Sequence, residues 1–205
     1  MTAGLTFDAG AHVYRHDGVR VPSVTQILAA EGFIDYSFLG EDSAHYLSRG
    51  QAVHAACEYL DEDRLDWSTV APAIEGYVRG YQKFKRVLGF YPTHIETHVF
   101  DEIYRYAGTL DRVGRIGDAR KILIDLKTGP ICSWVGAQLG GYAGAVRFNQ
   151  IFADWNYLER WGVQLTADGG YQITKFEDHE GDLAVFRSAC ICYNWKKNAG
   201  ILKGE

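Results

Sequence analysis

Asp111 and the run Asp125-Leu126-Lys127 supply two carboxylates and an ammonium, the residue types that cut phosphodiester bonds. Two carboxylates on adjacent strands can hold a hard cation such as Mg²⁺, which prefers oxygen ligands and keeps several waters. Such an ion lowers the pKa of water, and Lys127 would add positive charge beside the phosphorus. The pattern predicts a metal-dependent nuclease. The plain alternative is a surface strand on which Asp125 and Lys127 form an ion pair.

Two segments read as the strands that would position these side chains. KILIDLKTGP (121–130) alternates apolar and charged residues, which is typical of a strand with one strongly buried face, so that Asp125 and Lys127 point the same way. YRYAGTLDRVGRI (104–116) is rich in Tyr, Thr, Val and Ile and predicts a second strand. We expect Asp111 partway along it, facing the same cleft.

Two further segments have helical patterns. SWVGAQLGGYAGAVRF (133–148) places Gln138 and Tyr142 one turn apart on one face. Its Gly140 and Gly141 each cost about 1 kcal/mol relative to alanine in a helix, which indicates a close approach of another element or a ligand. Ordinary tight packing of the helix on the sheet is the alternative.

The segment EDSAHYLSRGQAVHAACEYLDED (41–63) is also helical, and His54 and Glu58 lie one turn apart beside its apolar stripe. The alternative for His54 is a structural role as a hydrogen-bonded histidine of the core. The stripe itself consists of Tyr46, Gly50, Val53, Cys57 and Leu60.

Four segments in this order resemble the PD-(D/E)XK nuclease superfamily, in particular its RecB-like exonuclease branch with its phage and mitochondrial genome maintenance members. They are GQAVH (50–54), GTLD (108–111), IDLKTG (124–129) and QLGGY (138–142). The likeness covers about residues 50–142 and extends weakly to VPSVTQIL (21–28). It implies a restriction-endonuclease-like α/β core, a central mixed sheet flanked by helices.

The resemblance also implies a role for each matched residue. Lys127 would be the catalytic lysine, and Gln138 and Tyr142 would steady the site or the DNA end. One or two Mg²⁺ or Mn²⁺ ions would be held by His54, Asp111, Asp125 and the backbone carbonyl of Leu126.

Two acidic residues are further candidates. Glu96, within THIETHVF (93–100), matches an acidic position that the family often shows before GTLD, and Glu58 follows His54 by one helical turn. Asp125 stands where the family often has Glu, but the shorter side chain still matches the RecB-like variant.

The four cysteines, Cys57, Cys132, Cys190 and Cys192, show no C-x-x-C spacing. A zinc ribbon is therefore not expected, and reduced, buried thiols are the better interpretation. Some nucleases of this superfamily hold an iron-sulfur cluster through closely spaced downstream cysteines. The C-I-C pair does not match that spacing, so we expect no cluster.

Length and composition favour one folded domain. The 205 residues, 47% of them hydrophobic, suit a single nuclease domain over 1–205, with a helical N-terminal part at about 23–88 and a catalytic core at about 91–198. No apolar run is long enough for a membrane span, and the first residues lack the order of a signal peptide. We expect a cytoplasmic protein of a bacterial or phage-infected cell with no membrane contact.

The net charge of −5 argues against a protein that coats duplex DNA by bulk electrostatics. Any DNA surface must therefore be local. The best candidate is RGYQKFKR (79–86), where Arg79, Lys83 and Arg86 lie beside aromatic rings that could stack on bases. A solvated helix face is the alternative, and the same ambiguity holds for Lys196, Lys197 and Lys203 near the end of the sequence.

The remaining segments predict elements that complete one α/β unit. Residues 12–24 suit a hairpin with Asp17-Gly18 at its turn, after which Ser23 caps a helix to about Glu31. Segments 152–165 and 170–178 suit paired strands, and Asp178 begins a final helix that extends to about Asn198.

The expected function is a Mg²⁺- or Mn²⁺-dependent DNA exonuclease of recombination, repair or phage DNA processing. The expected partner is DNA with a free end or in single strands, with a recombination protein as a second candidate. Two alternatives stay open: a structure-specific endonuclease with the same site, and a nuclease-like protein that binds nucleic acid without cutting it.

Overall fold

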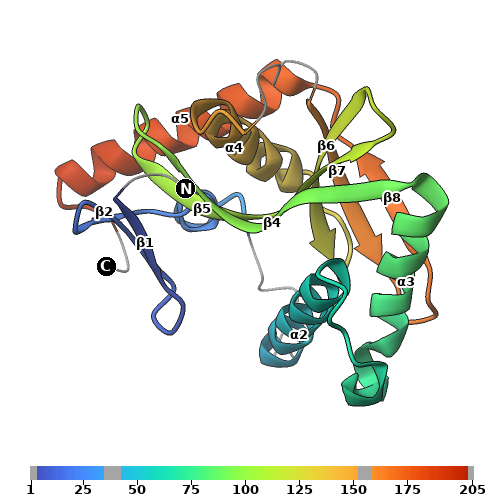
Figure 1. The fold of residues 1–205 in the computed structure, drawn as a ribbon. Helices are drawn as coiled ribbons and strands as arrows, with labels where there is room; N and C mark the ends of the chain where they lie inside the picture. The colour runs from blue at the N-terminus through green and yellow to red at the C-terminus, as the bar shows by residue number, and fades with distance from the viewer. Residues whose placement is uncertain (1–3, 35–42, 152–157, 203–205) are drawn as a thin grey trace.

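A computed structural model describes residues 4–34, 43–151 and 158–202 (Figure 1). The elements in chain order are β1 (Leu5–Asp8), β2 (Val13–His16), β3 (Val19–Val21), α1 (Val24–Ala30), α2 (Ser43–Asp61), the 3-10 turn η2 (Trp67–Thr69), α3 (Pro72–Leu88), β4 (Phe90–Asp101), β5 (Tyr106–Ile116), β6 (Arg120–Lys127), α4 (Trp134–Phe148), β7 (Leu158–Leu165), β8 (Tyr171–Lys175) and α5 (His179–Asn198). Strands and helices alternate through the second half, so the α/β class is confirmed.

The central element is a five-stranded sheet in the order β4-β5-β6-β7-β8. Its pairs are antiparallel except β6 and β7, which run parallel. A parallel pair needs a long crossover, and α4 supplies it between these two strands. The prediction of a central mixed sheet is therefore confirmed.

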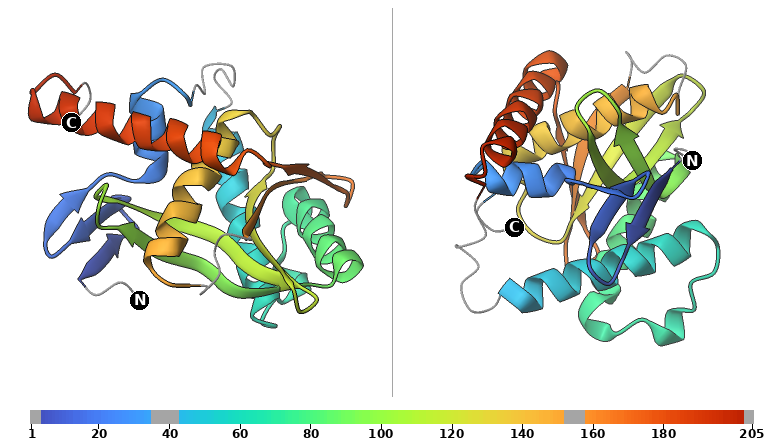
Figure 2. Two further views of the ribbon diagram at one scale, coloured as in Figure 1. Left: turned by 90° about the horizontal axis from the view of Figure 1, so that it is seen from above. Right: turned by 90° about the vertical axis from the view of Figure 1, so that its left-hand side faces the viewer.

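Helices cover both faces of this sheet. Figures 1 and 2 show α4 and α5 on one side and α2 and α3 on the other. Strand β6 is buried on both faces: Ile122 packs in the core shared with α2 and α3, and Leu123 in the core shared with α4 and α5. The prediction of one strongly buried face is wrong for this strand, because a central strand between two helical layers has no solvent side.

Strands β5 and β6 pair only part of the way along their length. Their register ends at Arg112 opposite Ile124, after which β5 continues beside β4 and β6 beside β7. The sheet therefore opens between these strands, and the same antiparallel register would place Asp111 opposite Asp125. Residues opposite each other in such a pair share a face of the sheet.

Local signals in the sequence predicted several boundaries well. Ser23 accepts a hydrogen bond from the Gln26 amide and completes a capping box at α1. Asp178 caps α5 through the Gly181 amide. The predicted hairpin is β2 and β3, but β1 adds a third strand that was not predicted. Strand β4 was not predicted either.

The glycines of α4 admit another helix. A Cβ at Gly140 would lie 2.9 Å from the backbone carbon of Asp182, and one at Gly141 would lie 3.0 Å from the Phe186 ring. Both neighbours belong to α5, so the close approach predicted from these glycines is helix-on-helix packing within the core. No ligand is needed to explain them.

The stripe predicted for α2 is buried only in its second half. Val53 and Cys57 are fully buried, whereas Tyr46 in the first turn of α2 is 38% exposed. Tyr46 therefore does not belong to the core.

The four cysteines are free thiols, but their environments differ. Cys57 and Cys190 are buried as predicted, Cys132 is half-buried and Cys192 is exposed on α5. The prediction of buried thiols is therefore wrong for Cys192, whose helix face is solvated. Residues 152–157 of the predicted strand 152–165 lie outside the described residues, and its remainder is β7. Among the described helices, none combines the length and apolar character needed to cross a membrane.

Candidate metal and nucleic-acid site

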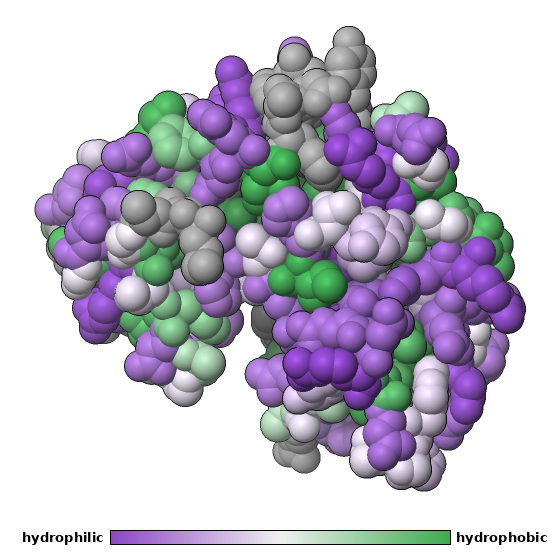
Figure 3. Space-filling view, in the orientation of Figure 1, coloured by the Kyte–Doolittle hydropathy of each residue, from purple (hydrophilic) through white to green (hydrophobic). Residues whose placement is uncertain are grey.

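The predicted site lies in a cleft of about 1160 Å³ between the N-terminal three-stranded sheet and α2. Figure 3 shows the surface hollowed between these two parts of the molecule. Five of the predicted site residues line it, and they come from α2, β4 and β6: His54, Glu58, Glu96, Leu126 and Lys127. The topology therefore collects side chains that are far apart in sequence.

His54 lies at the centre of the site. Its Nδ1 lies 3.5 Å from Oε1 of Glu96 and 3.6 Å from Oδ1 of Asp111. Its Nε2 lies 3.0 Å from the carbonyl oxygen of Leu126. Because a carbonyl can only accept, Nε2 carries a hydrogen, and Nδ1 faces the two carboxylates.

His54, Glu96 and Asp111 form a group that could hold a metal ion, because their ligand atoms lie within 4.8 Å of one another. A histidine with two carboxylates is a donor set for divalent cations. The sequence predicted His54 and Asp111 for this role and ranked Glu96 below Asp125. The structure places Glu96 in the group, and Asp125 lies outside it.

Asp111 is held where β5 and β6 separate. Its Oδ2 accepts a hydrogen bond of 2.6 Å from the Leu126 amide, which has no partner on β5 at this point. Both backbone groups of Leu126 are thus used, the amide by Asp111 and the carbonyl by His54. This arrangement leaves Oδ1 of Asp111 directed toward His54.

Asp125 and Lys127 form a pair on the next part of β6. The Lys127 ammonium lies 2.6 Å from Oδ2 of Asp125, whose carboxylate is 2% exposed. That oxygen is buried and accepts no hydrogen bond of normal geometry from the described residues. The cation beside this carboxylate is therefore the lysine itself, and the ligand role of Asp125 stays a prediction.

Gln138 and Tyr142 lie on α4 behind this pair. Lys127 donates to Oε1 of Gln138 over 3.4 Å, and Gln138 donates to the Tyr142 hydroxyl over 3.5 Å. Lys127 also lies 5.5 Å from the centre of the Trp134 ring. These contacts orient the lysine. Gln138 and Tyr142 therefore contribute to the site by positioning Lys127.

Glu96 has a backbone conformation that is costly for any residue except glycine. Its φ is 40°, in the left-handed region, within the long strand β4. Such a conformation costs about 1–3 kcal/mol and persists where the surrounding structure enforces it, often at functional sites. Arg112 holds the Glu96 carboxylate through a 2.8 Å hydrogen bond to Oε1. The role of this arginine was not predicted, because no local pattern in the sequence marks a buried charge.

The two carboxylates favour the charged form of His54. Burial opposes the charge on His54, but Asp111 and Glu96 outweigh it and raise the pKa of His54 to about 9. Burial raises the pKa of Asp111 to about 6, an effect that His54 opposes and Asp125 and Glu96 increase. Burial also acts on Glu96, yet His54 and Arg112 lower the pKa of that carboxyl.

Glu58 lies at the edge of the cleft, one turn along α2 from His54. Burial and the nearby Glu96 raise the pKa of Glu58. It does not belong to the three-residue group, so its ligand role stays a prediction.

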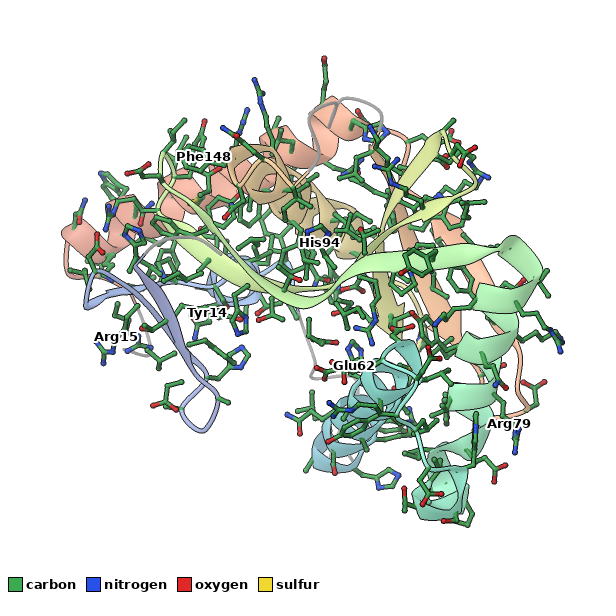
Figure 4. The ribbon with its side chains drawn as sticks, in the orientation of Figure 1. Tyr14, Arg15, Glu62, Arg79, His94 and Phe148 are labelled. Carbon is green, nitrogen blue, oxygen red and sulfur yellow. The ribbon has the colours of Figure 1, made fainter. Side chains whose placement is uncertain are left out.

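The basic residues predicted to bind DNA lie elsewhere. Arg79 pairs with Glu75 over 2.6 Å on the outer side of α3 and points away from the cleft (Figure 4). Lys83 and Arg86 are exposed on the same helix and do not line the cleft. DNA binding by this stripe stays a prediction. Near the end of α5, Lys196 pairs with Glu31 over 2.7 Å and joins α5 to α1.

Lys197 also has partners within the described residues, and Lys203 lies outside them.

No protein-family model matches the sequence, and comparison with curated proteins gives no match. Any assignment of function therefore depends on the geometry of the cleft.

Binding of a divalent cation should release protons. An ion that takes the Nδ1 lone pair must displace a proton from His54, whose pKa of about 9 keeps the ring charged at pH 7. We expect about one proton per ion at pH 7, and an apparent Mn²⁺ affinity that rises with pH up to about 9. Titration calorimetry in two buffers of different ionisation enthalpy measures this number. Proton release that persists in His54→Asn would contradict the assignment.

Proposed function

We propose that this protein is a divalent-metal-dependent DNA exonuclease with a restriction-endonuclease-like core of the PD-(D/E)XK, RecB-like type. The observation that carries the proposal is the convergence of His54, Glu96 and Asp111 beside Lys127, at the point where β5 and β6 separate. Asp125 lies next to this group as a buried carboxylate. His54, Glu96 and Lys127 line the cleft, and Asp111 and Asp125 are buried beside them.

The donor set fits Mg²⁺ or Mn²⁺. Carboxylate oxygens from two strands suit hard cations, and one imidazole nitrogen is compatible with Mn²⁺. When bound, such an ion supplies a nucleophile at neutral pH and offsets charge on the phosphate. The buried carboxylate of Asp125 adds a further negative charge beside this donor set, and Lys127 balances it in this structure.

The protein's own groups then have distinct tasks. Lys127 is held by Asp125 and Gln138 and presents a preorganised positive charge to a phosphate oxygen. Asp111 is fixed by the Leu126 amide, so it needs no reorganisation to accept a cation. The Tyr142 hydroxyl, behind Gln138, keeps the amide oriented toward the lysine.

Two alternatives share parts of this site. A structure-specific endonuclease would use the same residues and differ only in how it selects its substrate. A nuclease-like protein that only binds nucleic acid would be expected to lack a ligand or the lysine, and here the carboxylates, the imidazole and the lysine are all present and close together. The residues therefore favour catalysis.

Cleavage of end-labelled linear DNA and of closed circular DNA tests the proposal. We expect trimming of the linear substrate with Mg²⁺ or Mn²⁺, none with EDTA, and little loss of the circle. Cleavage of the circle would favour the endonuclease alternative. Unchanged cleavage in EDTA, or none with either metal, would refute a metal-dependent nuclease.

Substitution of Glu96 tests which carboxylates bind the ion. Glu96→Gln removes a negative ligand that lies 3.5 Å from His54 Nδ1, so Mn²⁺ affinity should fall at least tenfold. Glu102→Gln, on the exposed turn after β4, is the matched control and should leave affinity unchanged. Titration of the metal by calorimetry gives both values. Equal affinities would exclude Glu96 as a ligand and leave Asp125 as the remaining candidate.

A further inference from the structure

The cleft has an aromatic wall that the catalytic proposal does not use. Phe7 of β1 lines it, together with His12 in the turn after β1 and His98 of β4. The ring of Phe7 lies 5.3 Å from that of His12 and 4.9 Å from that of His98. Behind them, Tyr14 of β2, which Figure 4 labels, stacks on Phe7 with ring centres 4.4 Å apart.

This wall is fixed to the strands that carry the metal group. Thr109 of β5 contacts the Tyr14 hydroxyl at 2.6 Å and Nδ1 of His98 at 2.7 Å. Thr109 precedes Asp111 by two residues, a distance of about 7 Å along a strand. A base that stacks on these rings would therefore lie close to a phosphate at the metal group.

The cleft has few cations. The Lys and Arg side chains that line it are Arg49 and Lys127, against Glu58 and Glu96, and the charge on His54 faces Glu96 and Asp111. Arg49 is also held in place, because it donates to the Thr128 carbonyl over 3.1 Å and lies 4.9 Å from the centre of the Tyr46 ring. Duplex binding depends on many phosphate contacts, whereas a single strand can bind through its exposed bases.

We propose that the cleft takes single-stranded DNA, with bases stacked on the wall of Phe7, His12 and His98 and the adjacent phosphate directed to the metal group. This inference rests on the proposed nuclease function and names its substrate class. Stacking on aromatic side chains is tolerant of sequence, so the wall would accept any base. The hairpin of β1 and β2 is thus a substrate-binding element.

Fluorescence anisotropy of a short fluorescein-labelled oligothymidine, measured in EDTA, tests the proposal without any cleavage. The same oligomer annealed to its complement is the duplex comparison. We expect the single strand to bind at least tenfold more tightly than the duplex. The slope of log affinity against log salt should be about 1.4 in magnitude, since Arg49 and Lys127 each contribute about 0.7 with a single strand.

Two substitutions remove rings from the wall while sparing the fold. Phe7→Leu keeps an apolar contact with Tyr14, and His12→Asn suits the left-handed backbone at φ 51° in an exposed turn. Each should weaken binding of the single strand about tenfold. Trp195→Ala, on α5 with 65% of the residue exposed, is the control and should change nothing. Thermal melting followed by circular dichroism confirms that each variant folds.

The outcomes separate this inference from the nuclease proposal. Unchanged binding in both folded ring variants, or equal affinity for duplex and single strand, would overturn the aromatic wall as a binding surface, whether or not the protein cuts DNA. Binding that behaves as expected, with no metal-dependent cleavage in a parallel assay, would refute the nuclease and leave the wall as a single-strand site.

Discussion

Lys127→Ala and Asp111→Asn should each lower Mg²⁺-dependent DNA cleavage by at least two orders of magnitude. The lysine is a preorganised charge directed at the phosphate, and loss of such a group costs about 10²–10³ in rate. Asp111 is the carboxylate that joins β5, the Leu126 amide and His54, so the amide in Asp111→Asn removes the charge that a cation needs. Initial rates on end-labelled DNA measure both effects.

Matched controls separate loss of chemistry from loss of charge. Lys175→Ala removes an exposed lysine from β8, and Asp118→Asn removes an exposed carboxylate from the turn between β5 and β6. Both should cleave like the parent protein. Circular dichroism must show that Lys127→Ala and Asp111→Asn are folded. If these two variants keep equal residual activity near the parent rate, the cleavage comes from another site or a contaminant.

Arg112→Met should lower the free energy of unfolding by about 3–5 kcal/mol, the usual cost of removing one partner from a buried ion pair. Arg112 and Asp61 both have fully buried side chains, and the arginine Nε donates to Oδ2 of Asp61. Lys85 contacts the same carboxylate over 2.7 Å. Without the guanidinium, the buried negative charge of Asp61 would be balanced only in part, by Lys85. Urea denaturation followed by circular dichroism measures the loss.

An exposed ion pair is the comparison. Arg120 contacts Glu159 at 2.7 Å near the edge of β6, where both side chains are partly exposed, so Arg120→Met should cost less than about 1 kcal/mol. In the double variant Arg112→Met/Asp61→Asn, the loss in free energy of unfolding should be smaller than the sum of the two single losses, because the residues share one interaction. Equal effects of Arg112→Met and Arg120→Met would contradict a structural role for the buried network.

The elements that were predicted from sequence carry their signals locally. The alternation in β6, the helical spacing in α4 and the caps Ser23 and Asp178 each depend on residues within one or two turns. The segments that carry Asp111 and Asp125 were also placed correctly, since both lie in strands with strong β character. Patterns of this kind remain visible without knowledge of the tertiary fold.

What the sequence missed depends on long-range contacts. Arg112 and Asp61 are fifty-one positions apart, and no periodicity pairs them. Glu96 was a second-tier candidate from the sequence, but its left-handed backbone inside β4 is a conformation that sequence patterns do not indicate. Likewise, the aromatic wall exists only because β1 and β2 pack against β4 and β5, which brings Phe7 to His98.

The central claim is that one divalent cation binds where β5 and β6 separate. Anomalous X-ray diffraction from crystals grown with Mn²⁺ locates the ion most directly. We predict an anomalous peak within bonding distance of His54 Nδ1, Glu96 and Asp111, beside Asp125 and Lys127. A peak elsewhere, or none in crystals of protein that cleaves DNA with Mn²⁺, would contradict the account.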